Sequence, residues 1–222
     1  MTILRIDGGV LRRGGREVLR DLTLQVGYGK VVALLGANGS GKSSLLLAVA
    51  GELTLSAGDL WLFGTRVTDG ESWNRARAGV SLVPQTDYLY DDLTVRENLR
   101  IATAYTDRSD MAARRATAEG LWAKRLPMVR LDTLASHLST GEARFLSILC
   151  GLARRSRLLM VDEPSAGLSE PMASTVFDLL RRAATAESSV IIAEQRRDLA
   201  AGVADTMVVL NHGGIAWQGA GP

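Results

Sequence analysis

Residues 36–43 have the composition of a loop that binds phosphate groups. Glycines in this stretch would let the backbone fold tightly around a polyphosphate, so that its N–H groups and the positive end of a following helix point at the oxygens. Lys42 adds a mobile positive charge, and the Ser43 hydroxyl is of the kind that ligates Mg²⁺ beside the β- and γ-phosphates. The alternative is a glycine-rich turn that only joins a strand to a helix. We predict phosphate binding, and the predicted binding residues are Gly36, Ala37, Asn38, Gly39, Ser40, Gly41, Lys42, Ser43 and Ser44.

Two carboxylates follow an apolar run in the second half of the chain. Residues 158–161 are entirely apolar, and Asp162 and Glu163 come directly after them. An open α/β sheet binds its ligands at the carboxyl ends of its strands, where such side chains are held rigidly. We expect Asp162, with Ser43, to hold Mg²⁺, and Glu163 to polarise a water for in-line attack on the γ-phosphate, a role worth about 10²–10⁴ in rate. Taken alone, the pair also fits solvated acids at an ordinary strand end; next to a phosphate loop it favours nucleotide hydrolysis.

The elements that must position these residues have the pattern of a doubly wound α/β core. The apolar runs Val31–Leu35, 158–161, 190–193 and 207–210 suit central strands of a parallel sheet that is covered on both faces. Helical spacing occupies 44–50, 171–184 and 196–203 between them. Residues 3–7, 18–26 and 60–63 suit antiparallel strands, with a turn at 12–15, and 211–214 predict a hairpin.

The middle of the chain, 93–155, has no strand-like run and many helix formers. Thr94 and Glu97 have the spacing of a capping box at the start of a helix. We interpret the chain as a single domain over 1–222, in which 1–92 and 156–222 form an α/β core with an antiparallel part and 93–155 form a helical insertion.

Composition excludes several classes of protein. The chain has 222 residues, 46% hydrophobic content and a formal charge of +2, which suits one well-packed domain and gives no electrostatic case for a nucleic-acid partner. Cys150 is the single cysteine, so we expect a buried structural thiol rather than a disulfide. No apolar run approaches the length of a membrane span, and the first residues do not have the pattern of a secretory signal.

Further blocks make the sequence similar to the ATP-binding subunit of ABC transporters over nearly its whole length. Val83, Pro84 and Gln85 resemble the Q-loop, which implies that Gln85 reaches Mg²⁺ and the attacking water and senses the membrane partner. Residues 163–168 resemble the start of the D-loop. Residues 138–142 resemble the family signature, usually written LSGGQ. The resemblance implies ATP and Mg²⁺ as ligands, and an antiparallel β subdomain and inserted helices around a P-loop core.

The signature block also has a physical reading of its own. Ser139 can cap a helix from Thr140 onward, with Gly141 in the first turn, and so offer a second phosphate-binding surface. The resemblance implies that Ser139, Thr140, Gly141 and Glu142 meet the nucleotide of a second ATP-binding subunit in a head-to-tail dimer. The alternative is a plain capping box.

The sequence departs from the family pattern at several positions. Thr140 stands where the family has Gly and Glu142 where it has Gln, which should weaken contact with a triphosphate. Arg13 falls near the position of the aromatic residue that stacks on adenine, and a guanidinium can stack in its place. Ser169 replaces the D-loop aspartate. Gln195 replaces the switch histidine: it can hydrogen bond to the γ-phosphate but cannot titrate.

One branch of the family, the ATPases of branched-chain amino-acid and urea-type importers, has similar residues at two places. These are the pair Glu194 and Gln195 and the stretch 162–168. That branch implies transmembrane permease subunits, a solute-binding protein and a place at the cytoplasmic face of the cell membrane. A permease helix is expected to dock on the cluster of Tyr88, Leu89, Tyr90 and Leu93, flanked by Asp87, Asp91 and Asp92, unless these aromatics only fill the core of the insertion.

We therefore expect an ATPase that drives import of small polar solutes. Two alternatives stay open: a catalytically weak nucleotide-binding subunit of a heterodimer, favoured by Thr140, Glu142 and Ser169, and an exporter ATPase. A DNA-repair or translation ATPase would need a long coiled-coil insertion or a second nucleotide domain, and neither is in the sequence.

Overall fold

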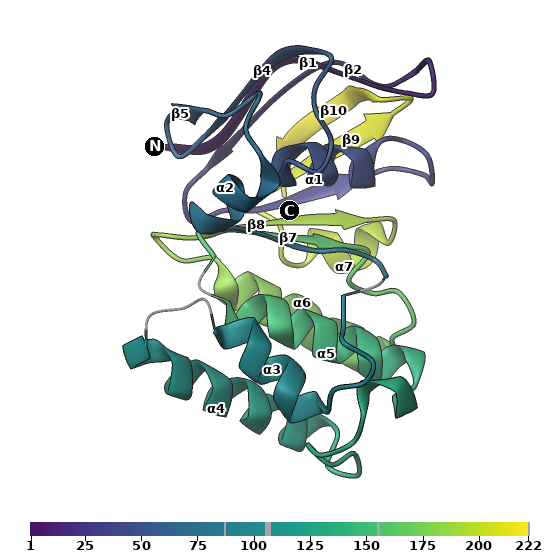
Figure 1. The fold of residues 1–222 in the computed structure, drawn as a ribbon. Helices are drawn as coiled ribbons and strands as arrows, with labels where there is room; N and C mark the ends of the chain where they lie inside the picture. Colours follow the sequence, from purple (N-terminus) through teal and green to yellow (C-terminus); the bar gives the residue numbers. More distant parts are fainter. Residues whose placement is uncertain (87, 105–107, 155, 222) are drawn as a thin grey trace.

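Two β-sheets form the framework of the computed structural model, which describes residues 1–86, 88–104, 108–154 and 156–221. One sheet is antiparallel and the other is mostly parallel, and helices lie on both sides of the parallel one (Figure 1). The antiparallel sheet and α1 (Lys42–Ala50) lie at one end of the molecule, and α3 (Val95–Thr103) and α4 (Arg108–Arg125) lie at the other. The α/β class expected from the sequence is confirmed.

The antiparallel sheet has the strand order β2-β1-β4-β5. Its strands are β1 (Thr2–Arg13), β2 (Arg16–Gly27), β4 (Ala57–Leu62) and β5 (Thr65–Arg66). The predicted turn over 12–15 is too long, because Arg12 and Arg13 still pair with β2. Only Gly14 and Gly15 turn, with φ values of 54° and 78°. Positive φ at both central positions is what a two-residue hairpin turn of type I′ requires.

The larger sheet has the strand order β10-β9-β3-β8-β7-β6. Its parallel strands are β3 (Val31–Leu35), β6 (Val80–Val83), β7 (Leu158–Asp162), β8 (Ser189–Glu194) and β9 (Thr206–Asn211). The edge strand β10 (Gly214–Ala220) pairs antiparallel with β9, which confirms the hairpin. Strand β6 was not expected from the sequence.

Each face of this sheet supports a separate hydrophobic core. Val32 and Leu34 of β3 face a core that they share with β1, β2, β4 and α1 (Lys42–Ala50). Val31, Ala33 and Leu35 face a second core with α3 (Val95–Thr103), α5 (Thr140–Ala153) and α6 (Glu170–Ala183). A strand that is apolar on both faces must be covered twice, so the continuous apolar runs correctly indicate central strands.

Between β6 and β7 the regular elements of the described residues are helices, joined by loops and turns that include an isolated bridge between Thr94 and Leu134. These helices are α3, α4 (Arg108–Arg125), a 3-10 turn (Ala135–His137) and α5. Thr94 and Glu97 form the predicted capping box at the start of α3. Trp122 of α4 stacks on Phe145 of α5 with ring centroids 6.1 Å apart, which fastens α4 to the signature helix.

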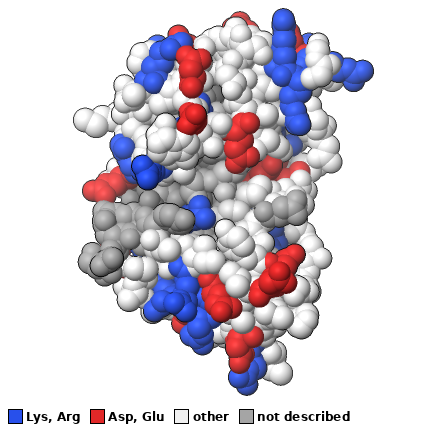
Figure 2. Space-filling model, in the orientation of Figure 1, with Lys and Arg blue, Asp and Glu red and all other residues white. Residues whose placement is uncertain are grey.

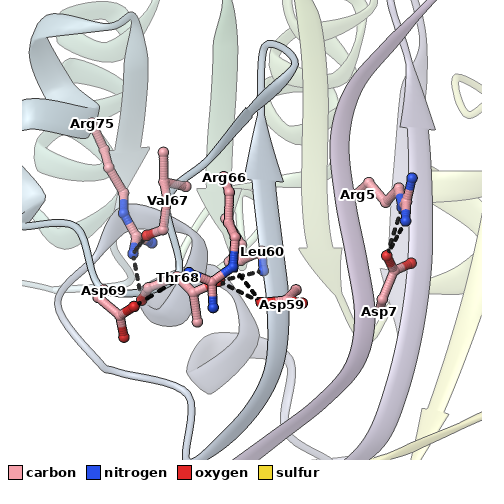
Figure 3. A network of polar contacts seen from close by, with 9 residues as sticks. All are labelled: Arg5, Asp7, Asp59, Leu60, Arg66, Val67, Thr68, Asp69 and Arg75. Carbon is pink, nitrogen blue, oxygen red and sulfur yellow. Dashed lines mark hydrogen bonds and ion pairs between the residues drawn. The ribbon is translucent and has the colours of Figure 1, made fainter.

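Short helix α2 (Ser72–Arg77) holds the end of α1 in place. Buried Arg75 donates to the carbonyls of Ala48 at 2.5 Å and Val49 at 3.1 Å, and to Val67 at 2.6 Å. Figure 3 shows Arg75 beside the β4–β5 region, where Arg66 is paired with Asp59 at 2.5 Å. A guanidinium at a helix C-terminus satisfies carbonyls that have no partner within the helix.

Charge is mixed on the face of the molecule shown in Figure 2. On the face in Figure 2, Lys and Arg side chains lie among Asp and Glu side chains at both ends of the molecule. Within the described part of the chain, every helix is too short or too polar to cross a membrane.

Candidate nucleotide site

The loop between β3 and α1 wraps closely around its own lysine. Lys42 Nζ donates to the carbonyls of Gly36 at 2.7 Å and Ala37 at 3.1 Å, and the side chain is buried. A Cβ on Gly36 would lie 2.5 Å from the carbonyl oxygen of Leu210 and from Ser40 Oγ, so only glycine fits there. The loop thus brings an ammonium group and the N-terminus of α1 to one place.

The start of α1 keeps its N–H groups free of a side-chain cap. Gly41 is the N-cap, with φ of 107°, and it has no side chain to accept from the first turn. A Cβ at Gly41 would also lie 3.0 Å from the carbonyl oxygen of Val18. Uncapped N–H groups at a helix start, next to a lysine, suit the oxygens of a phosphate.

Asp162 ends β7 with a buried and incompletely satisfied carboxylate. Among the described residues, Oδ1 of Asp162 is buried and has no hydrogen-bond partner. Burial raises the pKa of the Asp162 carboxyl, and the neighbouring Ser43 hydroxyl works against that rise. A hard cation such as Mg²⁺ prefers oxygen ligands, and it often takes only one or two from the protein and the rest from water and phosphate. The Asp162 oxygen, which has no donor in the part of the chain that the structure describes, and the Ser43 hydroxyl beside it suit that role.

Glu163 lies between two glutamines. Its carboxylate accepts from Gln85 Nε2 at 2.8 Å and from Gln195 Nε2 at 2.6 Å. Gln195 Nε2 also donates to Asn38 Oδ1 at 2.8 Å, so the group reaches the phosphate loop. Glu163 has φ of 48°, and its N–H donates to the carbonyl of Ala193 at 2.8 Å, which turns the side chain out of the strand.

The parallel sheet explains this convergence. The neighbouring strands β3, β8, β7 and β6 all end at the same edge of the sheet. The phosphate loop follows β3, and Gln195 follows β8. Asp162 and Glu163 lie at the end of β7, and Gln85 lies just after β6. Residues that are widely separated in sequence thus meet at one edge, where an open α/β sheet binds its ligands.

Two buried charged residues at this edge were not among the predicted site residues. Glu194, 2% exposed, accepts from the N–H groups of Ser165, Gln195 and Arg196 at 2.7–3.2 Å. Arg144 of α5 is also buried and donates to the carbonyls of Pro84 and Asp162. The acid at the end of a buried strand was a visible signal for Glu194, whereas Arg144 had none.

Residues 139–142 form a capping box at the start of α5, which the sequence offered as the alternative to a phosphate-binding surface. Ser139 Oγ accepts from the N–H of Glu142 at 3.3 Å, and the Glu142 carboxylate accepts from the N–H of Ser139 at 2.8 Å. A Cβ on Gly141 would lie 2.8 Å from the carbonyl oxygen of Gly167, so the D-loop packs on the start of α5. Thr140 is exposed and lies against the same turn.

The other predicted positions lie further out. Arg13 is exposed at the end of β1, and Ser169 is the N-cap of α6. Tyr88 and Leu89 pack against the second core, whereas Tyr90 is 58% exposed. The predicted docking cluster is therefore partly core, and Asp87 lies outside the described residues. Cys150 is buried, as expected.

Comparison with known proteins agrees with this geometry. A family profile described as ABC transporter matches residues 19–166. The chain is 32% identical to the "Probable branched-chain amino acid transport ATP-binding protein LivF" of Archaeoglobus fulgidus over 94% of this chain and 89% of that protein. It is 29% identical to the "High-affinity branched-chain amino acid transport ATP-binding protein BraG" of Pseudomonas aeruginosa, over 94% and 88%.

Solved structures give the same fold. One of them, the ADP conformation of an ATP-binding cassette of an ABC transporter, superposes with a TM-score of 0.82 at 26% identity, covering 100% of this chain and 92% of that one. A dimeric cassette bound to ADP and Pi in a post-hydrolysis state gives a TM-score of 0.86 at 16% identity, covering 99% of both chains, which is a likeness of fold alone.

Proposed function

Because the chain belongs to the ABC transporter family of ATP-binding ATPases, we propose that it powers a membrane importer of branched-chain amino acids or similar small polar solutes. The observation that carries the hydrolytic part is the position of Glu163 between Gln85 and Gln195 beside the phosphate loop. The names of two relatives in the branched-chain amino-acid class support the solute class.

Phosphate binding falls to the loop and to Lys42. In the free chain the ammonium is satisfied by the carbonyls of Gly36 and Ala37. A triphosphate would offer it stronger, charged acceptors, and the N–H groups of residues 37–44 would take the remaining oxygens. We assign Ser43, Gln85 and Asp162 to Mg²⁺, which when bound neutralises charge on the phosphates.

Hydrolysis needs a base and a means of holding the water. Glu163 is the base, placed to accept a proton from water that attacks the γ-phosphate in line. The amide groups of Gln85 and Gln195 hold the Glu163 carboxylate at two oxygens, which fixes its orientation. Gln195 lies close enough to Asn38 to reach the γ-phosphate when the loop is filled, and it donates there without titrating.

A second ATP-binding subunit would complete the site. We propose that Ser139, Thr140, Gly141 and Glu142 face the nucleotide of that subunit, and that Arg13 stacks on adenine. In this arrangement 1–92 and 156–222 act as the ATPase core and 93–155 as a helical insertion. The groove lined by Gln85, Tyr88 and Leu89 is where the permease would dock, at the cytoplasmic face of the membrane, with a solute-binding protein as a further component.

A catalytically weak subunit of a heterodimer is the second candidate. The Glu142 carboxylate, at the N-terminus of α5, adds negative charge to a surface that would meet a triphosphate. Thr140 is a β-branched residue at the same exposed surface. An exporter ATPase would share the site, because an ATPase subunit does not contact the solute.

Phosphate release by the purified chain separates an active ATPase from a catalytically weak subunit. The assay would cover a range of protein concentrations with the Glu163→Gln variant as the blank. We expect specific activity that rises with concentration and disappears in the variant, as a homodimerising ATPase requires. Activity equal to the blank at every concentration, with MgATP still bound, would favour the weak subunit of a heterodimer.

A further inference from the structure

Arg144 is a buried cation that joins three parts of the nucleotide site. It lies on α5 and is 6% exposed. Its Nη1 donates to the carbonyl of Pro84 at 2.6 Å, and its Nη2 donates to the carbonyl of Asp162. Within the described residues its Nε is buried without a hydrogen-bond partner, so these two carbonyls are the contacts that hold the guanidinium.

Both carbonyls belong to residues that directly precede the catalytic side chains. Pro84 is followed by Gln85, and Asp162 is followed by Glu163. The side chains of Gln85 and Glu163 then meet at 2.8 Å. One guanidinium is therefore hydrogen bonded to the backbone just before Gln85 and to the backbone just before Glu163. Because the guanidinium is planar and rigid, it sets the distance between these two backbone segments.

The same arginine connects this pair to the start of α5. Arg144 lies two residues after Glu142, which closes the capping box on Ser139. The start of α5 also packs against Gly167 of the D-loop. A shift of α5 along its axis would act on Pro84 and Asp162 through the guanidinium, because the side chain is buried and hydrogen bonded to both carbonyls.

The cost of burying this cation indicates a specific role. Burial lowers the pKa of Arg144, while Asp162, Glu194 and Glu163 raise it. Its two acceptors are neutral carbonyls, so the nearby carboxylates stay available for other ligands. If the site needed only core packing, an apolar side chain would fill the same space without the cost of desolvating a charge.

Resting on the proposed hydrolytic function, we propose that Arg144 is a positioning residue that sets the distance between Gln85 and Glu163 and links that distance to the placement of the signature helix.

The first test is steady-state kinetics of Arg144→Met and Arg144→Lys. For Arg144→Met we expect kcat to fall about 10- to 100-fold while the Kd for MgATP stays within about twofold, because the hydrogen bonds of Arg144 within the described residues go to Pro84 and Asp162 and not to the loop 36–44. Arg144→Lys should recover part of the loss, since an ammonium can donate to a carbonyl but cannot span both in a fixed geometry. Arg130→Met is the matched control, because Arg130 is exposed and pairs only with Asp132 among the described residues.

A double-mutant cycle gives the sharper result. If Arg144 acts through Gln85, the Gln85→Ala, Arg144→Met double variant should be no more than about twofold slower than Gln85→Ala alone. Losses that multiply, or a Kd for MgATP that rises in parallel with the loss of kcat, would overturn the proposal in favour of a general structural role.

A separate readout covers the case in which the wild-type chain turns over no faster than the Glu163→Gln blank, which would count against the proposed function. Amide hydrogen exchange is then compared between wild type and Arg144→Met. Faster exchange in the peptides that contain Thr86 and Glu163, with the β1–β2 hairpin unchanged, supports the positioning role. Unchanged exchange in both peptides overturns it.

Discussion

Gln195 donates to the Glu163 carboxylate over 2.6 Å, and its amide nitrogen also lies 2.8 Å from the side-chain oxygen of Asn38. One amide group thus connects the ends of β8 and β7 to the phosphate loop. An amide holds this geometry at every pH at which the protein is folded, whereas an imidazole in the same place would lose a donor as it titrates.

Replacing Gln195 should show whether its amide orients the Glu163 carboxylate and whether a side chain that titrates can take its place. We expect Gln195→Ala to lower kcat about 10- to 100-fold, because Glu163 loses one of its two amide partners. Gln195→His should retain part of the activity, and its kcat should change with pH around a midpoint of about 6.5, a dependence that the wild type lacks. The measurement is kcat from pH 5.5 to pH 9, and exposed Gln218→Ala is the control. A Gln195→His profile that matches the wild type would contradict this role.

The capping box of α5 offers a test of the signature surface. Glutamine can replace glutamate in a capping box, so Glu142→Gln keeps the cap and removes a negative charge. We expect ATPase activity to rise about two- to tenfold, since a charge that repels a triphosphate is lost. Glu97→Gln makes the same change in the capping box of α3, away from the site, and should leave activity unchanged. Equal effects of the two variants would show that the surface of α5 does not meet a nucleotide.

Arg75 should be a large contributor to stability. In Arg75→Ala the carbonyls of Ala48, Val49 and Val67 lose a buried donor. We expect the free energy of unfolding to fall by about 2–4 kcal/mol in a urea titration. Arg77→Ala is the control: Arg77 is exposed and lies over the Trp73 ring, so a change within about 0.5 kcal/mol is expected. Similar losses in both variants would refute a special role for Arg75 at the end of α1.

Cys150 provides a probe of unfolding. Burial raises the pKa of its thiol to about 12, so at pH 8 the folded protein holds the unreactive protonated form. The unfolded thiol has a pKa of about 8.5, so this group contributes stability that is present below that pH and decreases as the pH rises above it. A thiol-specific disulfide reagent at pH 8 should label Cys150 only under unfolding conditions. Rapid labelling without denaturant would mean that α5 opens readily.

Much of the fold was predictable because the apolar runs are continuous. Strands β3, β7 and β8 are buried at every residue, which gives a strong pattern, and β9 keeps an apolar run over 207–210 although it is only partly buried. Strand β6 was missed because it has four residues, includes Ser81 and lies between Gly79 and Pro84. Helix α2 was missed because it is short and polar, and its anchoring residue, Arg75, has the sequence appearance of a surface arginine.

The site divides in the same way. Residues 36–43, Asp162 and Glu163 could be singled out as candidates from the sequence because phosphate and cation chemistry restricts the residue types and their spacing. Arg144 was not, because its partners are backbone carbonyls, which any residue supplies. The contact between Gln195 and Asn38 also depends on the parallel pairing of β3 and β8, which brings together loops that are far apart in sequence.

The most direct test of the central claim compares binding and turnover in Glu163→Gln. Both are measured on the same samples, with Glu187→Gln as an exposed control. If Glu163 is the base held by Gln85 and Gln195, the Kd for MgATP should stay within about twofold while kcat falls by about 100-fold or more. A variant that keeps kcat within about threefold of the wild type would contradict the account, because water would then be activated without this carboxylate.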